Sequence, residues 1–197
     1  MSSPDLDHSA QGGESPEVVA SRIVHRGRIL TLRIDEVRLP EGDVVTREVV
    51  EHPGAVVIVA MDAAGRIALV RQYRHAVRRK LLELPAGTLE PGEEALATAA
   101  RELREEVGLV AGTWDRLGMF YSSPGFLREE MHAFLARELV EVPAEPEADE
   151  DIAVEWRSLA DLNAHPQQIE DSKSLACLLL ATRLLDSENR RPETREG

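Results

Sequence analysis

The sequence predicts a mixed α/β domain, with helices packed on a β-sheet, that follows a small antiparallel β subdomain. Two observations carry this prediction. In residues 21–52 apolar side chains recur mostly at every second position, which is the period of strands with one buried face. After residue 53, continuous apolar runs typical of fully buried strands alternate with segments of helical periodicity. The order of strands, a helix, more strands and then helices fits a sheet covered by helices.

The ends of the chain and the first subdomain differ in composition. Residues 1–17 and 188–197 are rich in polar, charged and proline residues, so we expect disordered tails there. Residues 18–52 form the expected β subdomain, in which PEGD at 40–43 turns the chain between two strands. A strand-rich segment of this size buries little core by itself, which favours pairing with a second copy of the chain.

Residues 53–187 predict the main domain. Its central helix is expected over 93–107, where Leu96, Ala100 and Leu103 fall on one face, and Gly108 ends it. The strands are expected at 55–62, 66–74, 81–84, 114–121, 130–137 and 152–157. Two further helices are expected at 158–164 and 172–186.

Charge and composition exclude several classes of protein. The net charge of −13 argues against general nucleic-acid binding, which needs a basic surface. No apolar run reaches the ~18 residues of a membrane span, and the N-terminus lacks the basic start and apolar stretch of a secretory signal. The single cysteine, Cys177, excludes an intrachain disulfide and a thiolate metal cage. We therefore expect a cytoplasmic protein that binds neither membranes nor nucleic acid.

Three glutamates on the predicted central helix indicate a metal site. Glu102, Glu105 and Glu106 are spaced i, i+3 and i+4, so their carboxylates project from one face of the helix, and we expect Glu106 to be exposed. Like charges so placed destabilise a helix unless a cation compensates, and carboxylate oxygens suit Mg²⁺, with Mn²⁺ as a substitute. Taken alone, the three residues also fit a solvated acidic face.

The spacing of the residues around these glutamates decides between a metal site and a solvated acidic face. Residues 87–109 fit G-x5-E-x7-R-E-U-x-E-E-x-G-U, where U is a bulky aliphatic residue, at every fixed position. So many defined residues at fixed offsets make chance agreement remote. The chain therefore resembles the Nudix superfamily of pyrophosphohydrolases, and the resemblance implies an α/β/α sandwich in which this box forms a loop, a helix and a second loop.

The resemblance also implies roles for residues of the box. Glu102, Glu105 and Glu106 would be metal ligands and so catalytic, and the backbone carbonyl of Ala86 would be a further ligand. Supporting roles would fall to Glu93 and Arg101, which would pair or orient the ligands, and to the backbone residues Gly87 and Gly108.

Outside the box, the runs REVVEHPGAVVIVA (47–60) and VRQYRHAVRRKLLELPAG (70–87), together with the turn SPGF at 123–126, resemble those of bacterial ADP-ribose pyrophosphatases, including actinobacterial forms. Pro124, in SPGF at 123–126, lies fifteen residues past the box, and Glu129 in the same loop would reach the terminal ribose or a metal-bound water. Arg74 would contact the diphosphate and Arg47 the adenosine end, tasks that suit the planar guanidinium. Glu83, on the strand that enters the box, would also contact the substrate.

An acidic loop at 145–151 would supply the catalytic base of the same enzymes. Glu150 is the first choice, and Glu147 and Asp149 compete with it. The resemblance implies Mg²⁺-dependent hydrolysis of ADP-ribose to AMP and ribose 5-phosphate by a homodimer paired through its N-terminal strands. The alternatives are hydrolysis of another nucleoside diphosphate sugar, such as GDP-mannose, and a regulator that binds ADP-ribose without cleaving it.

Overall fold

The computed structural model describes residues 15–145 and 152–190 and divides into two compact units. Of the described residues, the first unit holds 15–52 together with Gly125–Leu127, and the second unit holds the others. No pattern in the sequence predicted that Gly125–Leu127, which come from a later hairpin, would group with the first unit. In the described residues, no helix is long and apolar enough to cross a membrane.

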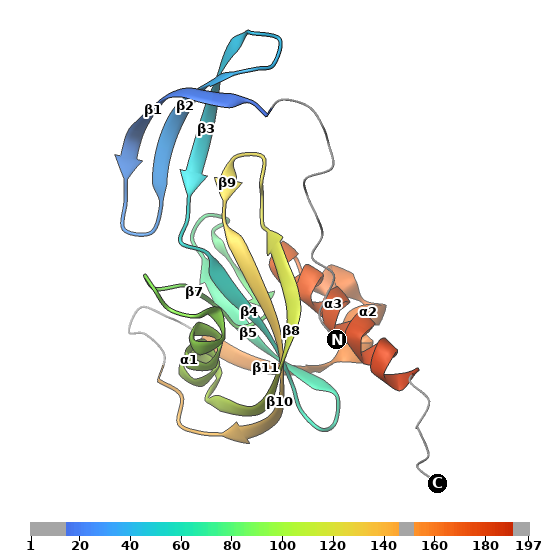
Figure 1. The fold of residues 1–197 in the computed structure, drawn as a ribbon. Helices are drawn as coiled ribbons and strands as arrows, with labels where there is room; N and C mark the ends of the chain where they lie inside the picture. Colours follow the sequence, from blue (N-terminus) through green and yellow to red (C-terminus); the bar gives the residue numbers. More distant parts are fainter. Residues whose placement is uncertain (1–14, 146–151, 191–197) are drawn as a thin grey trace. The chain divides into compact units, whose positions relative to one another are not determined.

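The first unit is an antiparallel sheet. Its strands β1 (Glu17–Arg26), β2 (Thr31–Arg38) and β3 (Val44–Glu51) follow one another, and the short β9 (Leu127–Arg128) completes the order β1-β2-β3-β9 (Figure 1). Most of its side chains are exposed, and Asp35 is its one buried residue among those described. A unit with so little core of its own depends on local strand pairing.

The second unit is built on a seven-stranded sheet of order β11-β5-β4-β10-β8, with β6 paired to β5 and β7 paired to β4. Strands β4 and β10 are parallel, and the other pairs are antiparallel. The bounds are β4 (Ala55–Met61), β5 (Arg66–Arg74), β6 (Arg79–Glu83), β7 (Ala86–Thr88), β8 (Leu109–Tyr121), β10 (Glu130–Glu141) and β11 (Ile152–Ser158).

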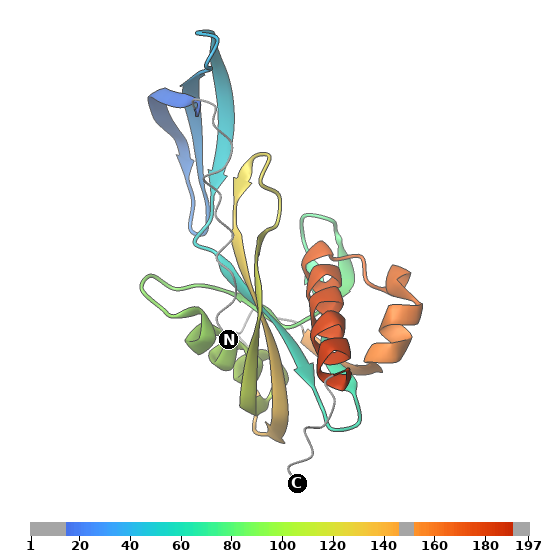
Figure 2. The ribbon, with the colours of Figure 1, turned by 45° about the vertical axis from the view of Figure 1, so that its right-hand side comes forward.

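Helices cover both faces of this sheet. Val56 and Ile58 of β4 face helix α1 (Ala95–Val107) in one apolar cluster. Val57 and Val59 face the opposite cluster, which contains residues of α2 (Leu159–Ala164) and α3 (Ser172–Asn189). Figures 1 and 2 show α1 on one side of the sheet and α2 and α3 on the other. The predicted mixed α/β fold with an α/β/α sandwich is therefore confirmed.

Several element boundaries differ from the expectations. The central helix starts at Ala95 because Glu94 is still extended, and α3 continues to Asn189, two residues into the expected tail. Strand β8 starts at Leu109 and β10 ends at Glu141, so this antiparallel pair is longer than predicted at the end where Leu109 faces Glu141, whereas its other end, at Tyr121 and Glu130, lies as predicted. Strand β7 was not predicted, because three residues are too short to show a period.

Candidate active site

Helix α1 carries the glutamates of the box, and its end is fixed by Gly108. This residue adopts the left-handed conformation (φ 69°), and its N–H donates to the carbonyl of Arg104 at 3.0 Å. A Cβ at this position would also meet the carbonyl oxygen of Val142 at 2.7 Å. Only glycine satisfies both conditions without strain, so the helix stops directly after the turn that holds Glu105 and Glu106.

The start of the box lies against the middle of this helix. A Cβ built on Gly87 would lie 1.9 Å from Cδ of Glu102 and 2.0 Å from its Oε1. The absence of a side chain at Gly87 therefore makes room for the Glu102 carboxylate. The backbone role expected for Gly87 has this close approach as its physical basis.

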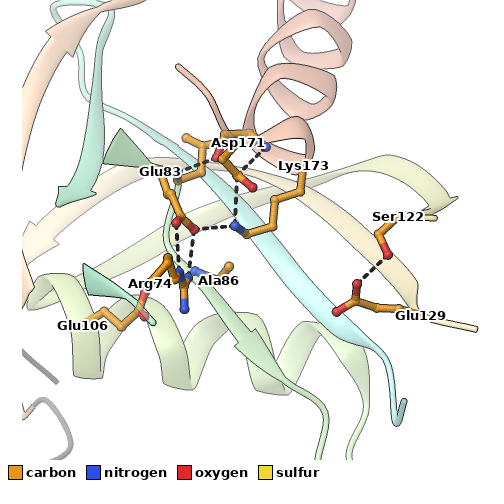
Figure 3. Close-up of polar contacts among 10 residues, drawn as sticks. Arg74, Glu83, Ala86, Glu106, Ser122, Glu129, Asp171 and Lys173 are labelled. Atoms are coloured by element: carbon orange, nitrogen blue, oxygen red, sulfur yellow. Dashed lines mark hydrogen bonds and ion pairs between the residues drawn. The ribbon is translucent and has the colours of Figure 1, made fainter. Parts of the chain in front are cut away.

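Glu106 is buried, with only 5% of its surface exposed. Its Oε2 accepts a hydrogen bond from the backbone N–H of Ala86 at 3.1 Å, because β7 runs beside the last turn of α1 (Figure 3). The expectation that Glu106 is exposed was therefore wrong. The same contact brings the backbone of Ala86, the expected carbonyl ligand, to one of the expected carboxylate ligands.

Arg101 links the acidic residues of the box. Its Nη1 donates to Glu102 Oε1 at 2.8 Å and to Glu105 Oε2 at 3.0 Å, and its Nη2 donates to Glu93 Oε2 at 3.2 Å. The hydrogen bonds from Arg101 hold the pKa of the Glu93 carboxyl below its usual value. Glu93 thus holds Arg101 from one side, while Arg101 orients two of the three glutamates on the expected metal face, the side of α1 that carries Glu102, Glu105 and Glu106.

The donor chemistry of this face fits a divalent cation. Glu102, Glu105 and Glu106 offer carboxylate oxygens from one stretch of α1, the ligand type that Mg²⁺ and Mn²⁺ prefer. In the described part of the chain, no three acidic, histidine or cysteine side chains already converge closely enough to hold an ion. Arg101 instead bridges Glu102 and Glu105 and offsets part of their negative charge.

A second charged cluster, built around Arg74 and Glu83, lies beside the expected metal face of α1. Arg74, at the end of β5, donates from Nε to Glu83 Oε1 and from Nη2 to Glu83 Oε2, both at 2.8 Å (Figure 3). Burial raises the pKa of the Glu83 carboxyl, but the hydrogen bonds from Arg74 and the charge of Lys173 outweigh it and hold this pKa below its usual value. The charge of Glu106 contributes to the raised pKa of Arg74, after its hydrogen bonds to Glu83, so the two clusters influence each other.

Sequence reasoning missed the contribution of helix α3 to this cluster. Lys173 Nζ donates to Glu83 Oε2 and pairs with Asp171 Oδ2 at 2.9 Å. Asp171 caps the helix by accepting from Ser174 N at 3.0 Å, and Ser174 Oγ accepts from Leu84 N at 2.8 Å. Aspartate three residues before serine at the start of an apolar helix signals the cap, but nothing local indicates the partner strand.

The remaining expected residues lie outside these two clusters. Glu129 accepts a 2.5 Å hydrogen bond from Ser122 Oγ, and Pro124 is exposed in the turn between them. Arg47 is exposed on β3 in the first unit. The candidate bases Glu147, Asp149 and Glu150 lie outside the described residues.

Comparison with known proteins bears on both units. Residues 51–178 match the NUDIX domain family, and residues 17–50 match the nucleoside diphosphate sugar hydrolase N-terminal domain. The chain is 51% identical over 149 residues to an ADP-ribose pyrophosphatase of Mycobacterium tuberculosis, which covers 74% of this chain and 72% of that protein. It is 42% identical over 139 residues to an ADP-ribose pyrophosphatase of Bacillus subtilis, with 71% and 75% covered.

A solved structure shares the fold. The crystal structure of an ADP compounds hydrolase superimposes with a TM-score of 0.80 at 23% sequence identity, covering 92% of this chain and 100% of that chain. At this identity the solved structure shows the fold alone. The family is shown by the NUDIX domain match and by the relatives of 51% and 42% identity.

Proposed function

Since the chain belongs to the Nudix family and is a Nudix hydrolase, we propose that it hydrolyses ADP-ribose to AMP and ribose 5-phosphate with bound Mg²⁺. The observation that carries this proposal is the pairing of Arg74 with the buried Glu83, next to the metal face of α1. The 51% identity to an ADP-ribose pyrophosphatase supports the choice of substrate. In the reaction, water adds to one phosphorus, the bond from that phosphorus to the bridging oxygen breaks, and the two phosphate products leave.

The residues of the box would hold and orient the metal ligands. Glu102, Glu105, Glu106 and the carbonyl of Ala86 would hold Mg²⁺, which lowers the pKa of bound water and offsets phosphate charge when present. Arg101 and the Ala86 N–H restrict the carboxylates through the hydrogen bonds described above. Such fixed groups need little rearrangement as charge develops on the phosphate, which is the main source of electrostatic catalysis.

Arg74 would bind the diphosphate. A guanidinium has five N–H donors, and two of those of Arg74 are taken by Glu83. In the described residues no other acceptor binds this guanidinium, and its side chain is 38% exposed. Three N–H groups therefore remain for phosphate oxygens, already oriented by the carboxylate behind them.

The proposal also assigns residues to the two ends of the substrate and to the catalytic base. Arg47 would hold the adenosine end, and Pro124 and Glu129 would contact the ribose end. Glu150 would accept the proton of the attacking water, with Glu147 and Asp149 as alternatives. These assignments rest on the resemblance to ADP-ribose pyrophosphatases.

A second candidate substrate is another nucleoside diphosphate sugar, such as GDP-mannose. The match of residues 17–50 to an N-terminal domain named for nucleoside diphosphate sugar hydrolases favours this broader class. We expect kcat/KM for ADP-ribose to exceed that for GDP-mannose at least about tenfold, or ~1.4 kcal/mol in transition-state binding. If GDP-mannose or another sugar diphosphate is the better substrate, the choice of ADP-ribose is wrong and the hydrolase assignment stands.

Replacing Arg74 tests the diphosphate contact. Arg74→Ala should raise KM for ADP-ribose at least about tenfold, while Mn²⁺ affinity, measured by titration, should stay unchanged because no box residue is altered. Arg79→Ala is the matched control, since Arg79 lies in the cationic run RQYRHAVRRK (71–80) that also holds Arg74, and among the described residues it pairs with the exposed Glu170. Wild-type kinetics for Arg74→Ala would show that the phosphates are held by metal alone.

The protein is also proposed to be a homodimer formed through its first unit. Val18, Ile23 and Val24 on β1 are about half exposed, as is Val44 on β3. Apolar side chains so exposed on a small sheet favour burial against a second copy. Light scattering at micromolar concentration should give twice the chain mass, and a fully active monomer would contradict the proposal.

A further inference from the structure

The buried carboxylate of Glu83 accepts hydrogen bonds from two cationic side chains, Arg74 and Lys173. Its side chain is 1% exposed, and its Oε2 accepts from both Arg74 and Lys173, while Oε1 accepts from Arg74 alone (Figure 3). The Lys173 side chain is itself only 18% exposed. The cost of taking this ammonium group largely out of water is offset by its contacts with the carboxylates of Glu83 and Asp171.

The charges of the cluster explain what Lys173 adds. Arg74 and Glu83 alone form a neutral pair, and Glu83 would then have a single counter-ion. With Lys173, Oε2 of Glu83 accepts from two donors, so the carboxylate that binds Arg74 is held in place and the guanidinium keeps a defined orientation toward an incoming anion. Asp171 balances Lys173, but its Oδ2 also accepts from Ser174 N and Ser174 Oγ at the start of α3.

The same turn of α3 is fixed to the strand end that leads into the box. Ser174 is fully buried, and its hydroxyl accepts from Leu84 N. Leu84 lies between Glu83 and the segment that reaches Ala86, whose N–H binds Glu106. Lys173 is therefore held at a fixed distance from Glu83 by the backbone on both sides.

We propose that Lys173 is a positioning residue for the phosphate site: by sharing Glu83, it fixes the Glu83 carboxylate and, through it, the orientation of the Arg74 guanidinium that binds the diphosphate. This inference rests on the proposed function, in which Arg74 binds the substrate phosphates. Lys173 acts through Glu83 and is not required to touch the substrate itself.

Kinetics of two variants test the inference. Lys173→Met keeps the apolar length of the side chain and removes its charge, and it should raise KM for ADP-ribose about tenfold with kcat within about threefold. Lys173→Arg keeps the charge and should restore KM to within about threefold of wild type. Lys80→Met, an exposed lysine on the same strand as Glu83, is the control and should not change KM. An unchanged KM in Lys173→Met, or equal defects in both Lys173 variants, would overturn the inference.

A spectroscopic readout separates this inference from the choice of substrate. In NMR spectra, the Nε–H of Arg74, identified by its loss in Arg74→Lys, should shift in Lys173→Met and remain near the wild-type position in Lys173→Arg. If wild-type protein does not hydrolyse ADP-ribose, the proposed function fails, and this signal still decides the inference. An unchanged Arg74 signal in Lys173→Met would refute it.

A double variant keeps the test valid if Lys173→Met folds poorly. Asp171→Asn/Lys173→Met leaves no uncompensated aspartate, and asparagine caps a helix about as well as aspartate. It should show the same rise in KM and the same shift of the Arg74 signal as Lys173→Met. Recovery of wild-type KM in the double variant would show that Lys173 only neutralises Asp171.

Discussion

Replacing Gly87 by alanine should displace a metal ligand without touching any acidic residue. The Cβ of the alanine would lie 1.9 Å from Cδ of Glu102 and 2.3 Å from its Cγ. Gly87 does not have a positive φ, so alanine meets no intrinsic backbone strain there. The whole effect of Gly87→Ala should therefore come from contact with Glu102.

The structure sets the size of this effect. To reach an ordinary contact of 3.4 Å, the Glu102 carboxyl must retreat by about 1.5 Å, which also separates it from Arg101. A displacement of about 1 Å in a reacting group typically costs about 10²-fold in rate, so we expect kcat to fall by at least that factor. The Glu102 side chain is 13% exposed and has room to swing outward, so the stability loss should stay near 1–2 kcal/mol.

Steady-state hydrolysis and thermal unfolding, measured side by side, test this prediction. Gly112→Ala is a matched control, because its Cβ would meet Oε2 of Glu138 at 2.7 Å, an exposed glutamate outside the box. This control should keep kcat within about threefold of wild type. If Gly87→Ala keeps wild-type kcat, or if both variants lose activity equally, then the position of Glu102 does not matter for catalysis.

Three other perturbations have defined outcomes. Chelation by EDTA should abolish turnover, and Mg²⁺ or Mn²⁺ should restore it; full activity in chelated protein would contradict the metal site. Glu106→Gln should lose at least about 10²-fold in kcat at nearly unchanged thermal stability, since an amide oxygen still accepts from Ala86 N, whereas Glu94→Gln should behave as wild type. Glu83→Gln should lower the free energy of unfolding by about 3 kcal/mol at neutral pH, because it removes the charged partner of Arg74 and one of the two charged partners of Lys173. The pKa of Glu83 is held below 4.5 in the folded protein, so this difference should be complete well above pH 4.5 and shrink as the pH falls below it; a difference independent of pH in urea unfolding would rule this out.

The sequence predicted the parts of the structure that local patterns determine. The run at 55–62 became the central strand β4 because both of its faces are apolar, and the box helix ends at Gly108 as its spacing indicates. The burial of Glu106 was not predictable, since it depends on the unpredicted strand β7. The partnership of Lys173 with Glu83 was equally hidden, because spacing along one helix carries no information about a strand ninety residues earlier.

The contacts between helix α3 and residues 83–84 have a consequence for when the site can fold during synthesis of the chain. Lys173 and Ser174 reach Glu83 and Leu84 across ninety residues of chain. Until α3 has been synthesised, the N–H of Leu84 lacks its Ser174 acceptor, Glu83 has only Arg74 as counter-ion, and the apolar side chains of β4 that pack against α3 remain exposed to water. A growing chain that already carries the complete box therefore does not yet hold its geometry. Activity should appear only when the last helix docks, so a partial translation product would be inert toward cellular nucleotides.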